Sequence, residues 1–296
     1  MAFVRRPTAK WQLGSRSLLL GPRTLVMGVL NVTPDSFSDG GVFFSTDAAL
    51  NHAMEMLEAG ADILDIGGES TRPGSQGISP EEEQERVLPV IEAVHRERRD
   101  AVLSIDTWRA STARAALEAG AEIVNDVSAF QWDEETAQVC AEFHCGVVLM
   151  HTRGRPSAWR TQPSLAQREV VALVREGLEQ SLQRAVRAGV DRSQVVLDPG
   201  YGFGKAMDNN YPLLAHQDDL LGLGRPLLAG ISRKSFLGHT LAVRQKRADV
   251  PVAERLHATL AGTTAAILAG AHIVRVHDVR PAVEAACIAD AILAEV

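Results

Sequence analysis

The sequence is short of aromatic residues and has no excess of positive charge. Aromatic residues make up 5% of its 296 positions, too few for a stacking surface that reads single-stranded nucleic acid. The formal net charge is −7, which argues against a broad nucleic-acid or membrane-surface role. Any anionic ligand must therefore be met by a local cluster of Lys, Arg and His side chains.

Cysteines and long apolar runs are also scarce. Cys140, Cys145 and Cys287 are odd in number and form no C-x-x-C pair, so neither a disulfide framework nor a zinc site is predicted. The run SLLLG at 17–21 is too short for a signal peptide or a membrane span. We expect a soluble cytoplasmic protein with no membrane or nucleic-acid partner.

Several catalytic motifs are missing. GYGFGK at 200–205 has the wrong spacing for a phosphate-binding Walker loop. GISRK at 230–234 lacks the second glycine of a serine-hydrolase nucleophile elbow. No H-E-x-x-H zinc-protease motif occurs. The chemistry must therefore come from residues that are scattered along the chain.

One phrase recurs along the chain: a helix-like segment, Ala-Gly, then a short apolar run. It is clear in EAGADILDIGG (58–68), EAGAEIVNDV (118–127) and LAGAHIVRVHDV (268–279). Glycine can close a helix in the left-handed conformation, and runs that are apolar on both parities are typical of parallel strands covered on both faces. Eight such runs occur, at 24–31, 62–67, 101–106, 122–127, 146–151, 195–199, 226–232 and 272–277.

Segments with helical spacing alternate with these runs, at 47–59, 80–98, 109–119, 133–144, 164–188, 208–221, 252–269 and 280–294. Eight alternations predict a single-domain α/β fold, a (β/α)8 TIM barrel over 24–296. An open doubly wound sheet is the alternative, which the absence of G-x-G-x-x-G after the first strand disfavours. We expect residues 1–23 to form a short hairpin-like extension over the barrel bottom.

The ends of the predicted strands carry polar residues, and active sites of such barrels lie at that end. We expect Asp65, Asp126 and His151 to be ordinary caps of strand ends. Arg275 and His277 are two apart and face the same side of the last strand. Two such groups directed into a barrel mouth are costly unless a ligand satisfies them.

Two groups of tip residues suggest two kinds of ligand. Asn31 offers a neutral amide oxygen, suitable as a single protein ligand for Mg²⁺, and an anion beside it would be bound by Arg72, Arg275 and His277. A flat heterocycle with an N–H and an exocyclic amine would suit the donors and acceptors of Asp106, Asn125, Asp198 and Lys234.

The strand ends resemble the signatures of the dihydropteroate synthase family, in that family's order. The matching stretches are GVLNVTPDSFSDGG, DIGGESTRPGS, SIDT, NDVS, LDPGYGFGK, GISRKSFLG and RVHDV. The resemblance implies a transferase of folate biosynthesis. It would join 6-hydroxymethyl-7,8-dihydropterin pyrophosphate to p-aminobenzoate, giving 7,8-dihydropteroate and pyrophosphate.

The resemblance also implies a role for each matching residue. Asn31 would bind Mg²⁺, and the pterin would be held by Asp106, Asn125, Asp198, Lys234 and Arg275. Pyrophosphate would be bound by Arg72, Arg275 and His277. The p-aminobenzoate pocket, which sulfonamides should share, would be lined by Phe37, Thr71, Pro73, Phe203, Lys234 and Ser235. Among these, Asp106, Asp198, Lys234, Arg275 and His277 would be catalytic. A homodimer is expected, through the last two helices.

We expect pyrophosphate to leave before the amine attacks, because the electron-rich dihydropterin can stabilise a methylene cation and the neutral arylamine needs no strong base. Two other functions remain open. A methyltetrahydrofolate-corrinoid methyltransferase also reads a pterin, although it leaves ESTRPG, SRKS and RVH unexplained. A paralogue that binds pterin without turnover would keep the same residues.

Overall fold

The computed structural model describes residues 3–33, 46–69, 77–163 and 165–296. Within these ranges eight strands form one parallel sheet, and each corresponds to one predicted run. The strands are β3 (Leu25–Asn31), β4 (Ile63–Gly67), β5 (Val102–Asp106), β6 (Ile123–Asp126), β7 (Gly146–Met150), β8 (Val195–Asp198), β9 (Leu228–Ala229) and β10 (Ile273–Val276).

The sheet curves into a nearly closed barrel. Its strands follow the order β8-β7-β6-β5-β4-β3-β10-β9. The two outer strands meet where Leu197 forms a parallel bridge with Leu227, and the Leu197 amide donates to the Pro226 carbonyl at 2.9 Å. The predicted (β/α)8 barrel is confirmed, and the alternative of an open sheet is wrong because the two edges join.

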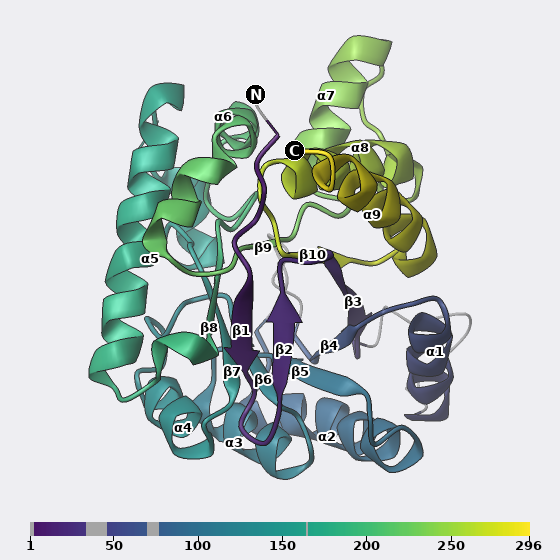
Figure 1. The fold of residues 1–296 in the computed structure, drawn as a ribbon, viewed down its shortest axis with the longest axis vertical. Coiled ribbons are helices and arrows are strands. Elements are labelled where there is room, and N and C mark those ends of the chain that lie inside the picture. Colours follow the sequence, from purple (N-terminus) through teal and green to yellow (C-terminus); the bar gives the residue numbers. More distant parts are fainter. Residues whose placement is uncertain (1–2, 34–45, 70–76, 164) are drawn as a thin grey trace.

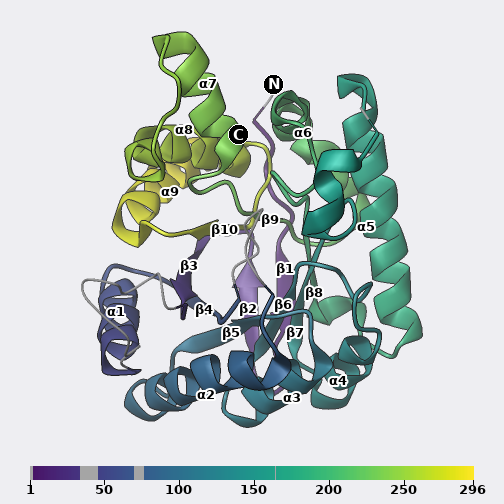
Figure 2. The ribbon, with the colours of Figure 1, turned by 180° about the vertical axis from the view of Figure 1, so that it is seen from behind.

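Helices surround the strands on the outside (Figures 1 and 2). They are α1 (Thr46–Glu58), α2 (Pro80–Glu97), α3 (Ala110–Glu118), α4 (Glu135–Phe143), α5 (Val170–Arg187), α6 (Asn210–Ala215), α7 (Ser235–Gln245), α8 (Leu256–Leu268) and α9 (Val279–Leu293). In the part of the chain that the structure describes, none of these helices has the length and apolar character to cross a membrane.

Helix α7 was not predicted, and β9 is shorter than its predicted run. The sequence indicated a strand over 226–232 and the next helix at 252–269, whereas pairing stops at Ala229 and α7 begins at Ser235. The chain turns between them, with Arg233 at φ 58°. Helix α7 ends at Gln245, and its C-cap is Lys246, also left-handed at φ 56°, so the usual glycine signal for a helix end is missing.

Alternation along the strands divides the apolar residues into two clusters. One parity faces the helices, as Leu64, Leu103 and Val274 do. The other parity faces the barrel axis, and its apolar members lie near the amino ends of the strands: Leu25, Met27, Ile63, Val102, Ile123, Val148, Val196, Leu228 and Ile273. One end of the barrel interior is therefore apolar, and the inward positions nearer the other end carry polar side chains.

A hairpin packs on the apolar end. Strand β1 (Ala9–Gln12) pairs antiparallel with β2 (Ser17–Leu20), and Figure 1 shows both crossing one end of the barrel. Trp11 is fully buried in the inner cluster, and its indole N–H donates to the Gln194 carbonyl at 2.7 Å. Gly146, the first residue of β7, has no side chain where Leu13 and Trp11 approach. The hairpin thus contributes to stability at the end opposite the polar residues.

Candidate functional site

The polar inward side chains lie toward the carboxyl ends of the strands. On β4 the residues that face the barrel axis are Ile63, Asp65 and Gly67, and on β5 they extend from Val102 to Asp106 at alternate positions. Among the described residues, the inward polar side chains include Asn31, Asp65, Ser104, Asp106, Asn125, Asp198, Arg275 and, just beyond β10, His277. Catalytic residues of such barrels occupy this face.

An ion-pair network joins these side chains across the barrel. The Arg275 Nε donates to Asp65 Oδ2 at 2.6 Å, and its Nη2 donates to Asp106 Oδ2 at 2.6 Å. Asp65 is fully buried and also accepts from Ser104 Oγ at 2.6 Å and Asn125 Nδ2 at 2.9 Å. Residues that are far apart in sequence, from β4, β5, β6 and β10, therefore meet at one carboxylate.

The prediction that Asp65 is an ordinary cap is wrong. It lies on the inward parity and is the acceptor that pairs Arg275. By contrast, Asp126 accepts the amides of Ser128 at 2.7 Å and Phe130 at 2.8 Å, which confirms its capping role. The His151 ring packs against the backbone of α5 at Gly177, as an ordinary structural residue would.

The Asp65 carboxylate fixes the orientation of Asn125. An ionised carboxylate only accepts hydrogen bonds, so the Asn125 amide must direct its NH₂ group toward Asp65. The Asn125 carbonyl oxygen is then left to accept a hydrogen bond from another partner. A heterocycle bound above Asn125 should therefore present an N–H to it.

Asp198 and Arg275 lie beside each other over Gly230. A Cβ atom on Gly230 would lie 3.8 Å from Asp198 Oδ2 and 3.9 Å from the Arg275 Cβ. Asp198 uses Oδ1 to accept the Gly200 amide at 2.7 Å. Burial raises the pKa of Asp198, and this hydrogen bond together with Lys234, Lys205 and Arg275 opposes the rise.

Opposing effects also act on the pKa of the Asp106 carboxyl. Burial raises its pKa to about 7, while Arg275 acts in the opposite direction and the nearby Asp65 charge adds to the rise. A ligand that donates hydrogen bonds to Asp106 would favour its ionised form. The group is therefore poised to respond to a cationic or N–H-rich ligand.

Lys234 and Phe203 come together from two different loops. The Lys234 Nζ lies 3.9 Å from the centroid of the Phe203 ring, a distance typical of a cation–π contact. The Trp159 ring makes an edge-to-face contact with the same Phe203 ring, and the two ring centroids are 5.4 Å apart. Ser235 follows as the first, exposed residue of α7. The structure brings these three predicted residues to one place.

Burial favours the neutral form of the His277 ring. Burial, followed by the charges of Arg275, Arg233 and Lys234, lowers its pKa to about 3. The Ser232 Oγ accepts the His277 amide and lies 3.0 Å from ring Nδ1. Because that hydroxyl can donate its proton to Nδ1, we assign the ring proton to Nε2, where it is available to an anion.

Lys205 is a supporting residue that the sequence analysis did not single out. Its Nζ is buried and donates to the carbonyls of Gly200 at 2.7 Å, His151 at 3.2 Å and Phe203 at 3.3 Å. Burial lowers the Lys205 pKa to about 7. The lysine ties the loop after β8 to the end of β7, so it fixes the position of Phe203.

Asn31 ends β3 beside Gly67 and is partly exposed. Among the described residues no group of three or more His, Cys, Asp or Glu side chains could hold a metal ion. The Asn31 side chain offers an amide oxygen, a kind of ligand that Mg²⁺ accepts. Phe37, Thr71, Arg72 and Pro73 lie outside the described residues, so their predicted roles stay predictions.

The network gives a testable expectation about Asp65. Replacing Asp65 by Ala leaves the buried Ser104 and Asn125 donors and the Nε of the partly buried Arg275 without their acceptor. We expect the free energy of unfolding to fall by about 3–5 kcal/mol, the usual effect of breaking a buried ion pair, as measured by urea denaturation. Asp65→Asn, which keeps the shape, should lose less.

Asp100 provides the matched control. Its carboxylate is exposed, with a side chain 77% accessible, so Asp100→Ala should change the unfolding free energy by less than about 0.5 kcal/mol. An Asp65→Ala protein that is no less stable than Asp100→Ala would contradict the central role given to this carboxylate.

Comparisons with known proteins agree with this geometry. The model of the family described as "Pterin binding enzyme" matches residues 27–277. The dihydropteroate synthase of Bacillus subtilis (strain 168) is 44% identical over 271 residues, which are 92% of this chain and 89% of that protein.

Solved structures give the same result. Xanthomonas albilineans dihydropteroate synthase with 4-aminobenzoic acid superposes with a TM-score of 0.87 at 40% identity, covering 97% of this chain and 99% of that one. Yersinia pestis dihydropteroate synthase in a sulfonamide drug complex gives 0.85 at 42% identity, covering 94% and 98%. The chain therefore belongs to the dihydropteroate synthase family of pterin-binding enzymes.

Proposed function

We propose that this transferase condenses 6-hydroxymethyl-7,8-dihydropterin pyrophosphate with p-aminobenzoate, giving 7,8-dihydropteroate and pyrophosphate. The observation that supports it best is the convergence of Asp106, Asn125, Asp198 and Arg275 at one barrel mouth. The family membership of the chain and its likeness to the Xanthomonas albilineans enzyme bound to 4-aminobenzoic acid agree with it.

The pterin edge suits the acceptors at the mouth. The ring offers an N–H and an exocyclic amine, and the Asn125 carbonyl oxygen and the Asp198 Oδ2 accept such donors. A hydrogen bond to a charged partner contributes roughly 1.5–3 kcal/mol. Arg275 is held through Nε by Asp65 and through Nη2 by Asp106, which fixes the plane of the guanidinium on which the ring would stack.

Pyrophosphate would be bound next to the pterin. Arg275 supplies charge, and His277 supplies the Nε2 proton assigned above. Arg72 would add a second guanidinium. Asn31 would hold Mg²⁺, which when bound neutralises charge on the diphosphate. The single amide oxygen at Asn31 fits an ion that keeps most of its waters and takes diphosphate oxygens.

The p-aminobenzoate pocket would lie between Phe203, Lys234 and the start of α7. Lys234 is the N-cap of α7 and makes no side-chain cap, and the amino end of a helix favours an anion. The carboxylate of p-aminobenzoate suits that position near Ser235, and Phe37, Thr71 and Pro73 would complete the pocket.

In the reaction the bond between the methylene carbon and the pyrophosphate oxygen breaks, and its electron pair leaves with pyrophosphate. The amine nitrogen then forms the new bond to carbon and loses a proton. We propose that ionisation comes first. Buried carboxylates at Asp106 and Asp198 favour a cation on the adjacent pterin, and no described side chain is needed as a strong base because the arylamine is neutral.

We expect rapid pyrophosphate release to require Mg²⁺ and both substrates, in a coupled assay that measures pyrophosphate, with no more than slow release when p-aminobenzoate is left out. Asp198→Ala should lose most activity because the pterin loses a charged acceptor, and Lys234→Ala should do so because it lies beside both substrates. Each loss should be about 10²-fold or more, as for other groups that stabilise developing charge.

The same assay separates the alternatives. Wild-type protein that releases no pyrophosphate but binds pterin would be a non-catalytic paralogue, and methyl transfer from methyltetrahydrofolate would identify the corrinoid-dependent class. Without p-aminobenzoate, ionisation first predicts slow Mg²⁺-dependent pyrophosphate release or a trapped pterin cation. If neither is ever detected, attack by the amine must accompany departure.

We expect sulfonamides to compete with p-aminobenzoate. The likeness to the Yersinia pestis enzyme in a sulfonamide drug complex supports this. Steady-state kinetics should show that a sulfonamide raises the KM for p-aminobenzoate and leaves the maximal rate unchanged. Turnover that is unaffected by excess sulfonamide would show that the pocket differs from the one proposed.

We also propose a homodimer formed through α8 and α9. Ile288 and Ile292 lie one turn apart on α9 and are 66% and 36% exposed. Part of the small-residue pattern of α8 has another explanation, since Gly262 allows close packing against Ile231 within the barrel wall. Light scattering should give twice the chain mass, and an Ile288→Glu, Ile292→Glu double variant should be monomeric. An unchanged mass in that variant would place the interface elsewhere.

A further inference from the structure

The Phe203 ring, in the loop after β8, has neighbours from two other connections of the barrel. The Lys234 Nζ lies 3.9 Å from the centroid of this ring. The Trp159 ring meets it at an angle of 86°, with ring centroids 5.4 Å apart. Lys234 precedes α7, whereas Trp159 belongs to the 3-10 turn Pro156–Thr161 between β7 and α5. Two separate connections therefore contact the same ring.

Glycines on both sides of Phe203 allow these two approaches. A Cβ atom on Gly202 would lie 3.4 Å from the Lys234 Cδ, and a Cβ atom on Gly204 would lie 3.0 Å from the Trp159 Cδ1. Gly204 also has a φ of 66°, a conformation that favours glycine. A side chain at Gly204 would push the β7–α5 connection outward, and the Trp159 ring would move away from Phe203 with it.

The backbone of Phe203 is held by bonds that do not involve its ring. The Phe203 amide donates to the Gly200 carbonyl at 3.1 Å, and the Phe203 carbonyl accepts from the Lys205 Nζ at 3.3 Å. These bonds fix the start of the side chain but leave its torsion angles free. The orientation of the ring therefore depends on its neighbours, which include Lys234 and Trp159.

The β7–α5 connection that carries Trp159 is also held by other side chains. The Trp159 indole N–H donates to the Gly154 carbonyl at 3.0 Å. Independently of this bond, the Gln162 Nε2 donates to the Arg153 carbonyl at 3.0 Å, and the Arg153 Nη1 donates to the Gly204 carbonyl at 3.2 Å. Removing the Trp159 ring should therefore leave the connection attached to the loop after β8.

We infer that Trp159 is a positioning residue for the arylamine substrate, because it sets the orientation of the Phe203 ring against which that substrate would lie. The inference rests on the proposed function, in which Phe203 and Lys234 line the p-aminobenzoate pocket. The Trp159 side chain is uncharged, so its loss leaves the charges that act on Asp198 in place. Trp159 therefore affects the binding of the arylamine more than the binding of the pterin.

The test compares Trp159→Leu and Trp159→Phe in the full chain by steady-state kinetics. Trp159→Leu should raise the KM for p-aminobenzoate by about threefold to tenfold, the range expected for the loss of one aromatic pair. The kcat should change by less than about twofold, because a contact made equally in the ground state and the transition state affects KM alone. Trp159→Phe keeps an aromatic ring at this place, so its KM should lie close to that of wild type.

Trp132→Leu provides the matched control. Trp132 lies between β6 and α4 and pairs with Trp108, with ring centroids 5.8 Å apart at an angle of 77°. It also lies 5.1 Å from the Arg155 Cζ, in the same connection as Trp159. The variant thus removes an equivalent ring pair and disturbs that connection away from Phe203. Its KM for p-aminobenzoate should stay within about twofold of wild type, and a rise equal to that of Trp159→Leu would contradict the inference.

A double variant tests whether Trp159 acts through Phe203. In a Phe203→Leu background, Trp159→Leu should raise the KM for p-aminobenzoate no further, because the ring that it orients is already gone. A further rise by the same factor would show that Trp159 acts by another route.

Two further measurements separate positioning from a general loss of structure. In Trp159→Leu the inhibition constant of a sulfonamide should rise by about the same factor as the KM for p-aminobenzoate, while the KM for the pterin pyrophosphate should change by less than about twofold. If both KM values rise alike, or if only the melting temperature falls, Trp159 is a structural residue and the inference is wrong. Wild-type protein without turnover would overturn the proposed function, whereas an active wild type with unchanged kinetics in Trp159→Leu would overturn this inference alone.

Discussion

The arrangement of the site depends on one ion pair inside the barrel, between the fully buried Asp65 and the partly buried Arg275. A guanidinium in this position requires an acceptor, because an unpaired buried charge is very costly. Asp65 meets that need and binds Ser104 and Asn125 at the same time. The direction of the Asn125 amide and the plane of Arg275 both follow from it, so the groups that we propose bind the pterin have fixed orientations.

Along the barrel axis, the apolar residues that stabilise the fold lie at one end and the polar residues of the candidate site lie at the other. Near the amino ends of the strands, Met27, Ile63 and their neighbours pack on Trp11 of the hairpin. Nearer the carboxyl ends, the same inward parity carries Asp106, Asn125 and Asp198. Apolar packing at one end can stabilise the fold while buried carboxylates with raised pKa values occupy the other. This division is expected for a barrel whose loops build the site.

The strands were predictable because each follows an Ala-Gly helix end and is apolar on both parities. The polar residues at the strand ends were predictable as a set, because each follows directly after one of these apolar runs. Asp65 was misjudged because an aspartate near a strand end resembles a cap until the register shows which face it occupies. Helix α7 was missed because it closes at Lys246 without a glycine. The face that Asp65 occupies depends on the strand register of the whole barrel, and the end of α7 carries no glycine signal in the sequence.

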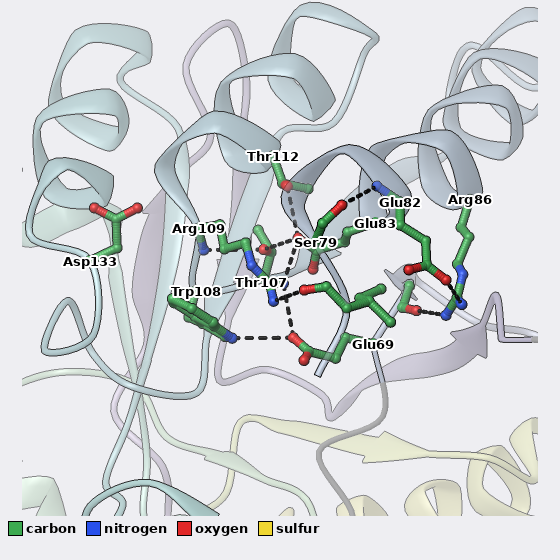
Figure 3. A network of polar contacts seen from close by, with 12 residues as sticks. Glu69, Ser79, Glu82, Glu83, Arg86, Thr107, Trp108, Arg109, Thr112 and Asp133 are labelled. Carbon is green, nitrogen blue, oxygen red and sulfur yellow. Dashed lines mark hydrogen bonds and ion pairs between the residues drawn. The ribbon is translucent and has the colours of Figure 1, made fainter. Parts of the chain in front are cut away.

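The β5–α3 connection links the inside of the site to its rim. Asp106 ends β5 and pairs with Arg275 inside the barrel, and three residues later Arg109 pairs with Glu69 and Glu83 outside it. Each guanidinium lies between two carboxylates, which neutralises it and leaves little freedom to move. A short connection between two such pairs holds Asp106, which we propose accepts hydrogen bonds from the pterin, at a fixed separation from Glu69 and Glu83, whose contacts with Arg109 Figure 3 shows. Two substrates that must meet at one carbon atom need this kind of fixed separation.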